Sequence, residues 1–301
     1  MNRVIADRGD SWKYPENSKM AIHSALDPDY YSSYSNYEGA FVDVRMTRDN
    51  QLVLCRSSNL MFISSGAGRI CCYSLDELKQ YHCQFHKVKF YQYYSNLRFS
   101  KEDESTKYLI RKLKKMMFQF DQFMSLEEAL QCLHGQKEII LNLCEDEFMN
   151  PRYMHEVIRI VNMYSGKDIK ICVPNDRILY EMKSLNPLLQ VGVRVNGDTS
   201  RKLNFEHNFE ICSIHDLVRD CFLLERCINW MKEGKPLYVD SLVIMKDMLS
   251  YIKMFQDSRM YPHAITPNPE IYRSLLQRAY QNGFVAYREV EKKEFVLRSI
   301  R

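Results

Sequence analysis

Short apolar segments alternate with amphipathic segments along nearly the whole chain. The apolar runs have the length and β-branched content of strands, and the stretches between them carry apolar residues at helical spacing. The predicted strands cover residues 3–8, 40–46, 138–144, 168–173, 188–195, 209–214, 237–242 and 263–266. Eight strand–helix alternations predict an α/β fold in which a parallel sheet closes into a (β/α)₈ barrel, with reactive groups at the carboxyl ends of the strands.

Local signals refine this pattern. A turn at 47–50 leads into a partner strand at 51–56. Ser125 stands three residues before Glu128, which predicts a capping box at the start of a helix over 125–133. Pro174 is expected to open the helix that ends before Asn186. Further helices are predicted over 152–164, 217–233, 244–256 and 269–281.

Two segments lie outside the barrel pattern. Residues 82–122 are rich in Phe, Tyr, Lys and Arg, and we interpret them as a subdomain inserted into a barrel that spans 1–281. Residues 282–301 form a short C-terminal extension. The segment 106–120 is a basic amphipathic helix, which favours packing over the barrel mouth with a solvated basic side. Peripheral contact with an anionic membrane or with a protein is the alternative.

Composition narrows the class of protein. The chain has 301 residues, 46% hydrophobic and 27% charged, with a formal net charge of +4. That charge is too small to indicate nucleic-acid binding, and no apolar run is long enough for a transmembrane segment. Ten cysteines occur without a Cys-x-x-Cys motif, which favours reduced thiols in a protein core and a cytoplasmic location. The N-terminus shows no signal peptide pattern.

Several short motifs follow one another in a specific order. They are IADRG at 5–9, PENS at 15–18, FVDVRMTRD at 41–49, SGAGRI at 65–70, YSLDEL at 73–78, MSLEEAL at 124–130 and AITPNPE at 264–270. Together they resemble the glycerophosphodiester phosphodiesterase family, whose first strand ends in His-Arg-Gly before a Pro-Glu-Asn loop. The resemblance covers about 1–80 and 123–280, and it implies a TIM barrel of the phosphoric diester hydrolase class, linked to lipid metabolism.

The resemblance also implies a mechanism. Family members bind Ca²⁺ or Mg²⁺ with the diester phosphate at the barrel mouth, use two histidines for acid/base work, and hold a phosphate oxygen with an arginine. Diester cleavage develops charge on phosphate oxygens and on the leaving alkoxide, so it needs a cation and proton donors. Oxygen ligands suit such hard cations.

The motifs keep some functional positions and replace others. Three family residues are retained: Arg8, Glu16 and Asp43. Asp7 and Arg56 stand where the two histidines are expected, and Phe41 and Cys144 stand where two metal-binding carboxylates are expected. Phe41 and Asp43 are two residues apart in a strand, so both face inward. Asp43 alone is a poor cation site, so we predict a pseudoenzyme with neither a metal cofactor nor acid/base catalysis.

The remaining arginines allow two interpretations of the mouth. Arg8 and Arg56, supported by Glu16 and joined by Arg194 if it faces inward, could bind a phosphorylated small molecule through forked guanidinium donors. Alternatively, Arg8 or Arg56 pairs internally with Asp7, Glu16 or Asp43, which leaves an inert mouth.

Two other functions stay open. One is an active phosphodiesterase that uses Ca²⁺ or Mg²⁺ with rearranged ligands, namely Asp7, Glu16, Asp43 and Glu145. The other is a protein-interaction module that acts through the insertion. The sequence does not choose a ligand or an oligomeric state.

Overall fold

The structure is a computed structural model of the whole chain. It describes residues 3–27, 37–85, 120–196, 205–242, 245–256, 261–267 and 269–282. The predicted helix over 106–120 and the extension 282–301 lie almost entirely outside these residues. Within the described part of the chain, no helix is both long and apolar enough to cross a bilayer.

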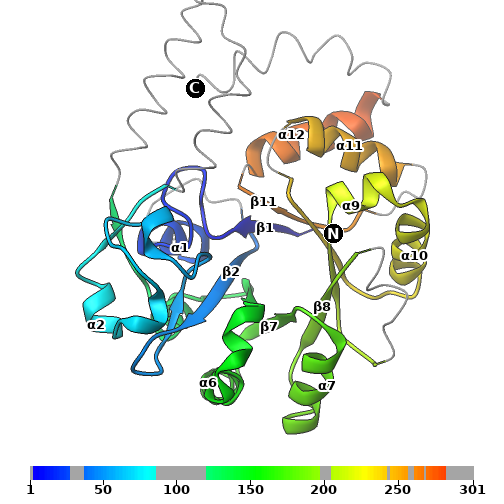
Figure 1. Ribbon diagram of the computed structural model, residues 1–301. Helices are drawn as coiled ribbons and strands as arrows, with labels where there is room; N and C mark the ends of the chain where they lie inside the picture. The colour runs from blue at the N-terminus through cyan, green and yellow to red at the C-terminus, as the bar shows by residue number, and fades with distance from the viewer. Residues whose placement is uncertain are drawn as a thin grey trace, which may run out of the picture.

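Eight parallel strands form a closed barrel, as the sequence predicts (Figure 1). Neighbouring strands pair in chain order, and β1 closes the circle because it pairs with both β2 and β11. The strands are β1 Val4–Asp7, β2 Gly39–Met46, β6 Glu138–Leu143, β7 Asp168–Val173, β8 Val191–Val195, β9 Glu210–Ser213, β10 Leu237–Asp240 and β11 His263–Thr266.

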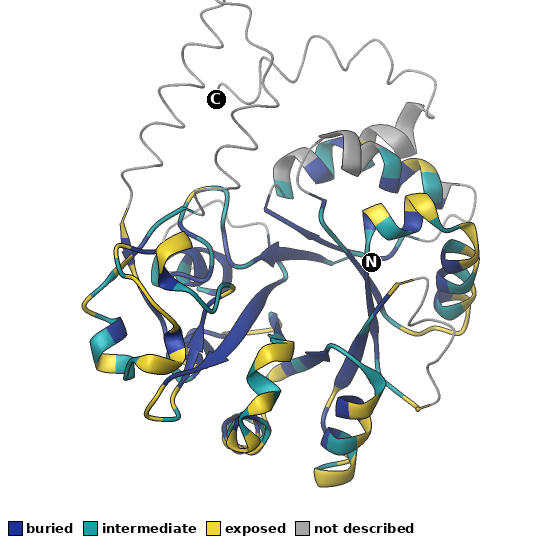
Figure 2. Cartoon of the chain, in the orientation of Figure 1, coloured by how far each residue is buried: buried dark blue, intermediate teal, exposed yellow. Residues whose placement is uncertain are grey.

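Helices surround this barrel and bury one face each against it (Figures 1 and 2). The strands are almost wholly buried, whereas the helices alternate buried and exposed positions, because each covers the sheet with one apolar stripe. The helices are α1 Lys19–Leu26, α5 Leu126–Gln131, α6 Pro151–Met163, α7 Asp176–Leu185, α9 Ile214–Arg219, α10 Cys221–Lys232, α11 Met245–Gln256 and α12 Pro269–Asn282.

Capping side chains set several helix boundaries. The capping box of Ser125 and Glu128 at the start of α5 is confirmed. Pro174 does not open α7, since Asn175 caps this helix by accepting a hydrogen bond from the backbone N–H of Ile178. The single helix predicted over 217–233 is wrong, because Asp220 caps α10 and thereby separates it from α9. Short polar side chains therefore decide boundaries that apolar periodicity leaves open.

Another boundary differs in β8. The prediction placed its start at residue 188, but the strand begins at Val191. Leu188 is 88% exposed, and its backbone N–H donates to the side-chain oxygen of Asn186. The Asn186-Pro187 turn thus extends further than the apolar pattern suggested.

Shorter elements complete the fold. The antiparallel strand β3 (Leu52–Leu54) pairs with β2, as the turn at 47–50 predicted. The pair β4 (His82–Cys83) and β5 (Asp121–Gln122) joins the two ends of the predicted insertion. The remaining elements are η1 Leu60–Phe62, η2 Ile70–Cys72, α2 Leu75–Leu78 and η3 Glu145–Met149.

An apolar layer fills the barrel interior. It is made by inward side chains of the strands and of the residue before β9, all at most 1% exposed: Ile5, Phe41, Ile140, Cys172, Phe209, Ile211, Tyr238 and Ile265. Alternation along each strand places these side chains inside and the next residues against the helices. The barrel is therefore a packed core and not a channel.

A polar network lies inside the amino end of the barrel. Glu138 is fully buried, and it accepts hydrogen bonds from Tyr238 and pairs with Arg3 and Lys170. Asp168 bonds to the same two cations. A buried carboxylate is tolerated here because several donors replace its water.

Candidate functional site

The carboxyl ends of the strands bring polar side chains together above the apolar layer. Asp7 ends β1, Asp43 lies in β2 two residues after Phe41, and Asn142 lies opposite Asp43 in β6. Arg194 in β8 and Asp240 at the end of β10 complete this ring, and Arg194 faces inward, since it pairs with Asp240 and lies over the ring of Phe41. We call these residues, together with the loop residues Arg8, Glu16, Asn17 and Arg56, the mouth cluster.

Arg8 lies at the centre of the mouth cluster. Its Nε donates to Asp43 Oδ2 at 2.6 Å and its Nη1 to Asp7 Oδ1 at 2.8 Å, while Glu16 Oε2 lies 4.0 Å from Nε. The Arg8 side chain is only 14% exposed. Burial alone would lower its pKa, but the charges of Asp43, Asp7 and Glu16 outweigh it, so the pKa of Arg8 is raised well above its usual range.

The backbone at Arg8 adopts an unusual conformation. Its φ of 61° is left-handed, and Asn17 and Ser241 in the same region have φ values of 59° and 64°. Residues other than glycine rarely adopt this conformation, because Cβ then crowds the backbone. The turn after β1 thereby directs the guanidinium of Arg8 toward Asp43. Strain of this kind persists where the surroundings over-determine it, and it is common at binding sites.

Both carboxylate oxygens of Asp43 accept hydrogen bonds from neighbouring side chains. Asn142 Nδ2 donates to Oδ1 at 2.6 Å, and Asn17 Nδ2 donates to Oδ2 at 3.1 Å beside the guanidinium of Arg8. Burial raises the pKa of this carboxyl, but Arg8, Asn142 and Asn17 together lower it to about 2. Asp43 is therefore an ionised group that shares the positive charge of Arg8 with Asp7.

Arg56 is more exposed than Arg8, the other loop arginine of the mouth cluster. Its side chain is 42% exposed, and Nη1 lies 4.0 Å from Glu16 Oε2, the oxygen that also approaches Arg8. The backbone carbonyl of Arg56 accepts hydrogen bonds from Arg45, which pairs with Asp146 of η3. Arg45 thus fixes the loop that carries Arg56.

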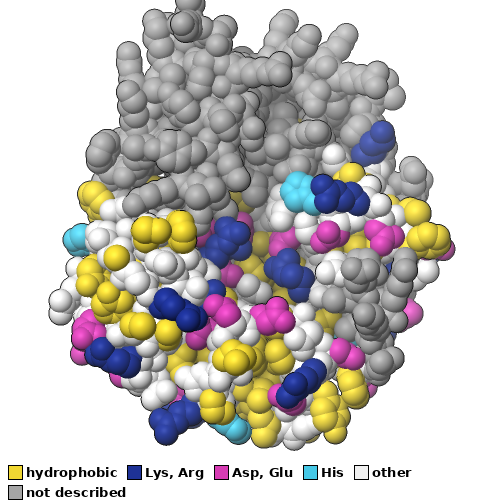
Figure 3. Space-filling view, in the orientation of Figure 1, with side chains coloured by type: hydrophobic (Ala, Val, Ile, Leu, Met, Phe, Trp, Pro, Cys, Tyr) yellow, Lys and Arg dark blue, Asp and Glu magenta, His cyan; other side chains and the backbone are white. Residues whose placement is uncertain are grey.

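On the other side of the mouth, Arg194 pairs with Asp240. Ser241 donates a hydrogen bond to the same carboxylate at 3.1 Å, and the guanidinium of Arg194 lies 5.9 Å from the ring centre of Phe41. Figure 3 shows basic and acidic side chains next to one another near the centre of this face of the molecule. The internal pairing predicted as one alternative for Arg8 is present.

The residues at the implied cation position do not fit a metal. Phe41 is fully buried in the apolar layer and offers no oxygen. Cys144 directly precedes η3, and burial, then the charge of Asp43, raises its pKa to about 12, so it carries a neutral thiol. Glu145, weighed as a substitute ligand, is exposed in η3. Within the described residues, no three His, Cys, Asp or Glu side chains lie together so that they could hold a metal ion.

Sequence reasoning missed four polar partners in the mouth cluster. Asn17, Asn142, Asp240 and Ser241 all bond to the charged groups named above. Strand parity could have found Asn142, because it stands two residues after the inward Ile140. Asp240 likewise stands two residues after the inward Tyr238.

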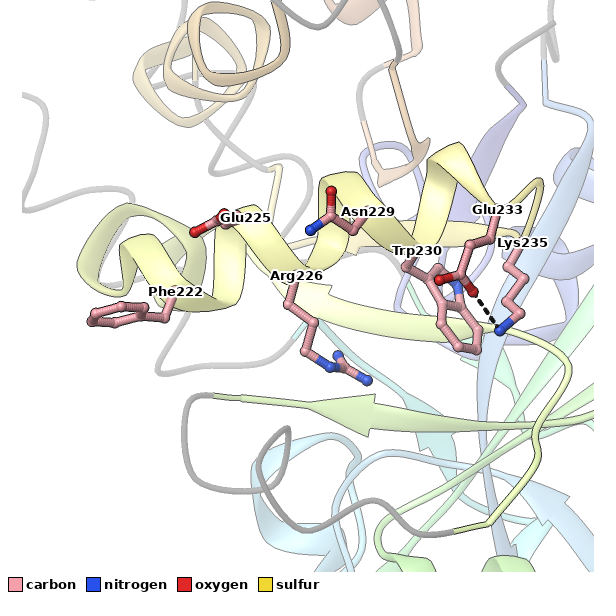
Figure 4. Close-up of a pocket in the computed structure, with 7 residues that line it drawn as sticks. All are labelled: Phe222, Glu225, Arg226, Asn229, Trp230, Glu233 and Lys235. Carbon is pink, nitrogen blue, oxygen red and sulfur yellow. Dashed lines mark ion pairs between the residues drawn. The ribbon is translucent and has the colours of Figure 1, made fainter.

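A separate cavity of about 500 Å³ lies along α10 (Figure 4). The side chains that line it already have partners. Arg226 pairs with buried Glu210. The ring of Trp230 stacks with that of His207, and the ammonium group of Lys235 also lies over it. Helix α10 belongs to the outer ring, so this cavity is not part of the mouth cluster.

No family model matches the sequence. A curated glycerophosphodiester phosphodiesterase from Caldanaerobacter subterraneus is 24% identical over 280 residues, which cover 91% of this chain and 98% of the relative. One from Bacillus altitudinis is 30% identical over 80 residues, covering 27% of this chain and 30% of the relative.

Solved structures of phosphodiesterases have a similar fold. An Oleispira antarctica phosphodiesterase in complex with the product sn-glycerol-3-phosphate has a TM-score of 0.63 at 16% identity, covering 93% of this chain and 97% of that one. A glycerophosphoryl diester phosphodiesterase from Silicibacter pomeroyi, described as putative, has a TM-score of 0.69 at 14% identity, covering 93% and 94%. The resemblance drawn from the motifs is confirmed.

Proposed function

We propose that this chain, which resembles the glycerophosphodiester phosphodiesterases in sequence and fold, is a barrel of that kind that has lost metal-dependent hydrolysis. One observation carries the proposal: Asp43, the retained carboxylate, is bonded by Arg8, Asn17 and Asn142. Its neighbours at the implied cation position are a buried phenyl ring and a neutral thiol. A divalent cation needs several oxygen ligands, and this arrangement offers it no site.

The imidazole side chains expected for acid/base catalysis are missing as well. A guanidinium such as that of Arg56 offers only hydrogen-bond donors and no acceptor for a proton. The carboxylate of Asp7 is bonded to Arg8 at 2.8 Å. An imidazole in either place could both give and take a proton near pH 7, which these two side chains do not offer. We therefore favour the pseudoenzyme over the active alternative with Asp7, Glu16, Asp43 and Glu145 as ligands.

Hydrolysis of bis-p-nitrophenyl phosphate and of glycerophosphocholine is expected at background, with Ca²⁺, Mg²⁺ or Mn²⁺. Each missing acid/base group alone costs on the order of 10²–10⁴ in rate. The assay compares the wild-type chain with Asp43→Ala, and the Caldanaerobacter relative serves as positive control. Metal-dependent turnover in the wild type that Asp43→Ala abolishes would establish the active alternative.

We further propose that the mouth cluster binds a phosphorylated small molecule. Arg56 and Arg194 support this, since their side chains are 42% and 36% exposed, whereas Arg8 is enclosed by its carboxylates. Forked guanidinium groups bind phosphate oxygens in pairs. In this proposal Arg8 and Glu16 hold the site in shape, and Arg56 supplies the main donor.

Inorganic phosphate and sn-glycerol-3-phosphate are expected to raise the Tm of the wild type, because a ligand that binds only the folded state stabilises it. At a concentration about 100 times Kd the gain is about 2.7 kcal/mol. The variant Arg56→Gln/Arg194→Gln should lose this shift, whereas Arg177→Gln, whose side chain is 87% exposed on α7, should keep it. Equal shifts in all three proteins, or none beyond that of chloride at matched ionic strength, would refute phosphate binding at the mouth.

Domain organisation and location also stay proposals. We infer a single barrel over 1–281 with 82–122 inserted, supported by the β4–β5 pair that joins the ends of the insertion. A cytoplasmic location is supported by ten free cysteines, six of them buried. An interaction role for the insertion is the weaker alternative, because nearly all of its residues lie outside the described part of the chain.

A further inference from the structure

Two of the exposed cysteines are adjacent in sequence. Cys71 and Cys72 form the end of η2, and both are exposed. Cys221, at the start of α10, is also exposed but has no neighbouring cysteine in the sequence. The other seven are buried or partly buried. Cys71 and Cys72 therefore form an exposed dithiol, whose chemistry differs from that of a single thiol.

The turn that carries this dithiol is anchored on its amino side. The side chain of Ile70 is 1% exposed and belongs to a small apolar cluster with Leu60 and Leu78. Its backbone N–H donates to Ser58 at 2.9 Å. The residue just before the dithiol is thus fixed to the body of the protein.

The carboxyl side of the turn is anchored as well. Arg48 Nη1 donates to the carbonyl of Cys72 at 2.9 Å, and the backbone N–H of Arg48 donates to the carbonyl of Tyr73 at 2.8 Å. Bonds on both sides hold the backbone of the two cysteines in one conformation. Binding of one ligand by both sulfurs then costs less conformational entropy, because the backbone is already ordered.

The two thiols lie close enough to affect each other. Burial and, next, the neighbouring thiol of Cys72 raise the pKa of Cys71. Consecutive Cα atoms are about 3.8 Å apart, so rotation about χ1 can turn both sulfurs toward one atom. The geometry therefore permits chelation by the pair.

The surroundings limit which ligand the pair can take. Structural zinc requires four ligands, usually tetrahedral. Within the described part of the chain, no third His, Cys, Asp or Glu completes such a cluster here. Two soft thiolates suit a thiophilic centre that needs only two sulfurs from the protein.

We propose that Cys71 and Cys72 form a binding site for monosubstituted trivalent arsenicals. The arsenic of R–As=O takes one sulfur from each cysteine, so two As–S bonds replace the As=O bond. The two thiol protons leave with the oxygen as one water molecule. No atom changes its net oxidation state, and arsenic keeps its organic substituent as third ligand.

Phenylarsine oxide is the probe, added in equimolar amount to the reduced, full-length wild-type protein. Intact mass spectrometry should show one adduct, equal to the reagent less one water, and two thiols should disappear from titration with a maleimide. Cys71→Ser and Cys72→Ser should each weaken binding by about two to four orders of magnitude, as expected when a second linked contact is lost. Cys221→Ser removes an exposed single thiol and should bind like the wild type.

The proposal fails if either single cysteine variant keeps wild-type affinity, or if the wild type forms no adduct at micromolar reagent. Both cysteines are exposed, so we expect the serine variants to fold, and circular dichroism checks this. Ethanedithiol, a competing dithiol, should reverse the adduct, whereas a monothiol at the same concentration should not. Reversal by both would indicate single-thiol attachment and refute chelation.

Discussion

Replacing Asp43 by asparagine is expected to lower the free energy of unfolding by about 1.5–3 kcal/mol, the usual contribution of a hydrogen bond to a charged group. Asparagine has the same shape as aspartate, so the change leaves no cavity. It leaves the guanidinium of Arg8, 14% exposed, without its closest carboxylate at 2.6 Å, whereas Asp7 still pairs with it at 2.8 Å. Urea denaturation at pH 7, followed by circular dichroism, measures the difference.

Two further variants test the cause of this loss. Glu181→Gln breaks the exposed pair with Arg177 on α7, which is 2.9 Å long, and should change stability by less than about 0.5 kcal/mol. Asp7→Asn/Asp43→Asn removes both carboxylates that bond to Arg8 and should cost about 3–5 kcal/mol, because the buried guanidinium then lacks a bonded counter-charge. A loss below about 1 kcal/mol for Asp43→Asn would contradict the buried pairing.

A second large effect is expected from pH, through His263 at the amino end of β11. Its Nδ1 accepts a hydrogen bond from the backbone N–H of Arg3 at 2.9 Å, and protonation would destroy this acceptor. Burial first, and then the positive charges of Arg3 and Lys170, lower the pKa of His263 from 6.5 to about 4. The unfolded chain therefore binds this proton at a higher pH than the folded chain does.

The sign of the effect follows from this difference. Stability from a neutral His263 is fully present above pH 6.5, and it decreases as the pH falls toward about 4. The difference between a pKa of 6.5 and one of about 4 corresponds to about 3 kcal/mol of folding stability. Urea midpoints between pH 7 and pH 5 should fall in the wild type and stay nearly level in His263→Asn, whose amide oxygen can still accept from Arg3. His134→Asn, at an exposed position, should behave like the wild type; equal slopes in all three would exclude His263 as the cause.

Local patterns were enough to predict the barrel. Strand positions, the capping box at Ser125 and the inward direction of Phe41 and Asp43 all depend on spacings of two to four residues. Each of these features depends on the residues of a single helix or strand, so it can be predicted from one sequence without an alignment. Whether Arg194 faces inward was left open, and its pairing with Asp240 shows that it does.

The partners inside the mouth depend on contacts between distant elements. Whether Arg8 would be open to a ligand or paired was left undecided, since Asn17 and Asn142 come from a loop and from another strand. Parity indicates that Asn142 faces inward, but its place beside Asp43 follows from the register between β2 and β6, which no local pattern specifies. The break between α9 and α10 at Asp220 was missed for a different reason, because apolar periodicity continues across it.

The filled barrel interior separates two charged regions of the molecule. Eight apolar side chains stand between the network around Glu138 at one end and the mouth cluster at the other. Perturbations that share no neighbours act independently, so replacements at one end should leave the energetics of the other unchanged. A change of charged residues at the mouth should therefore leave the packing at the opposite end intact.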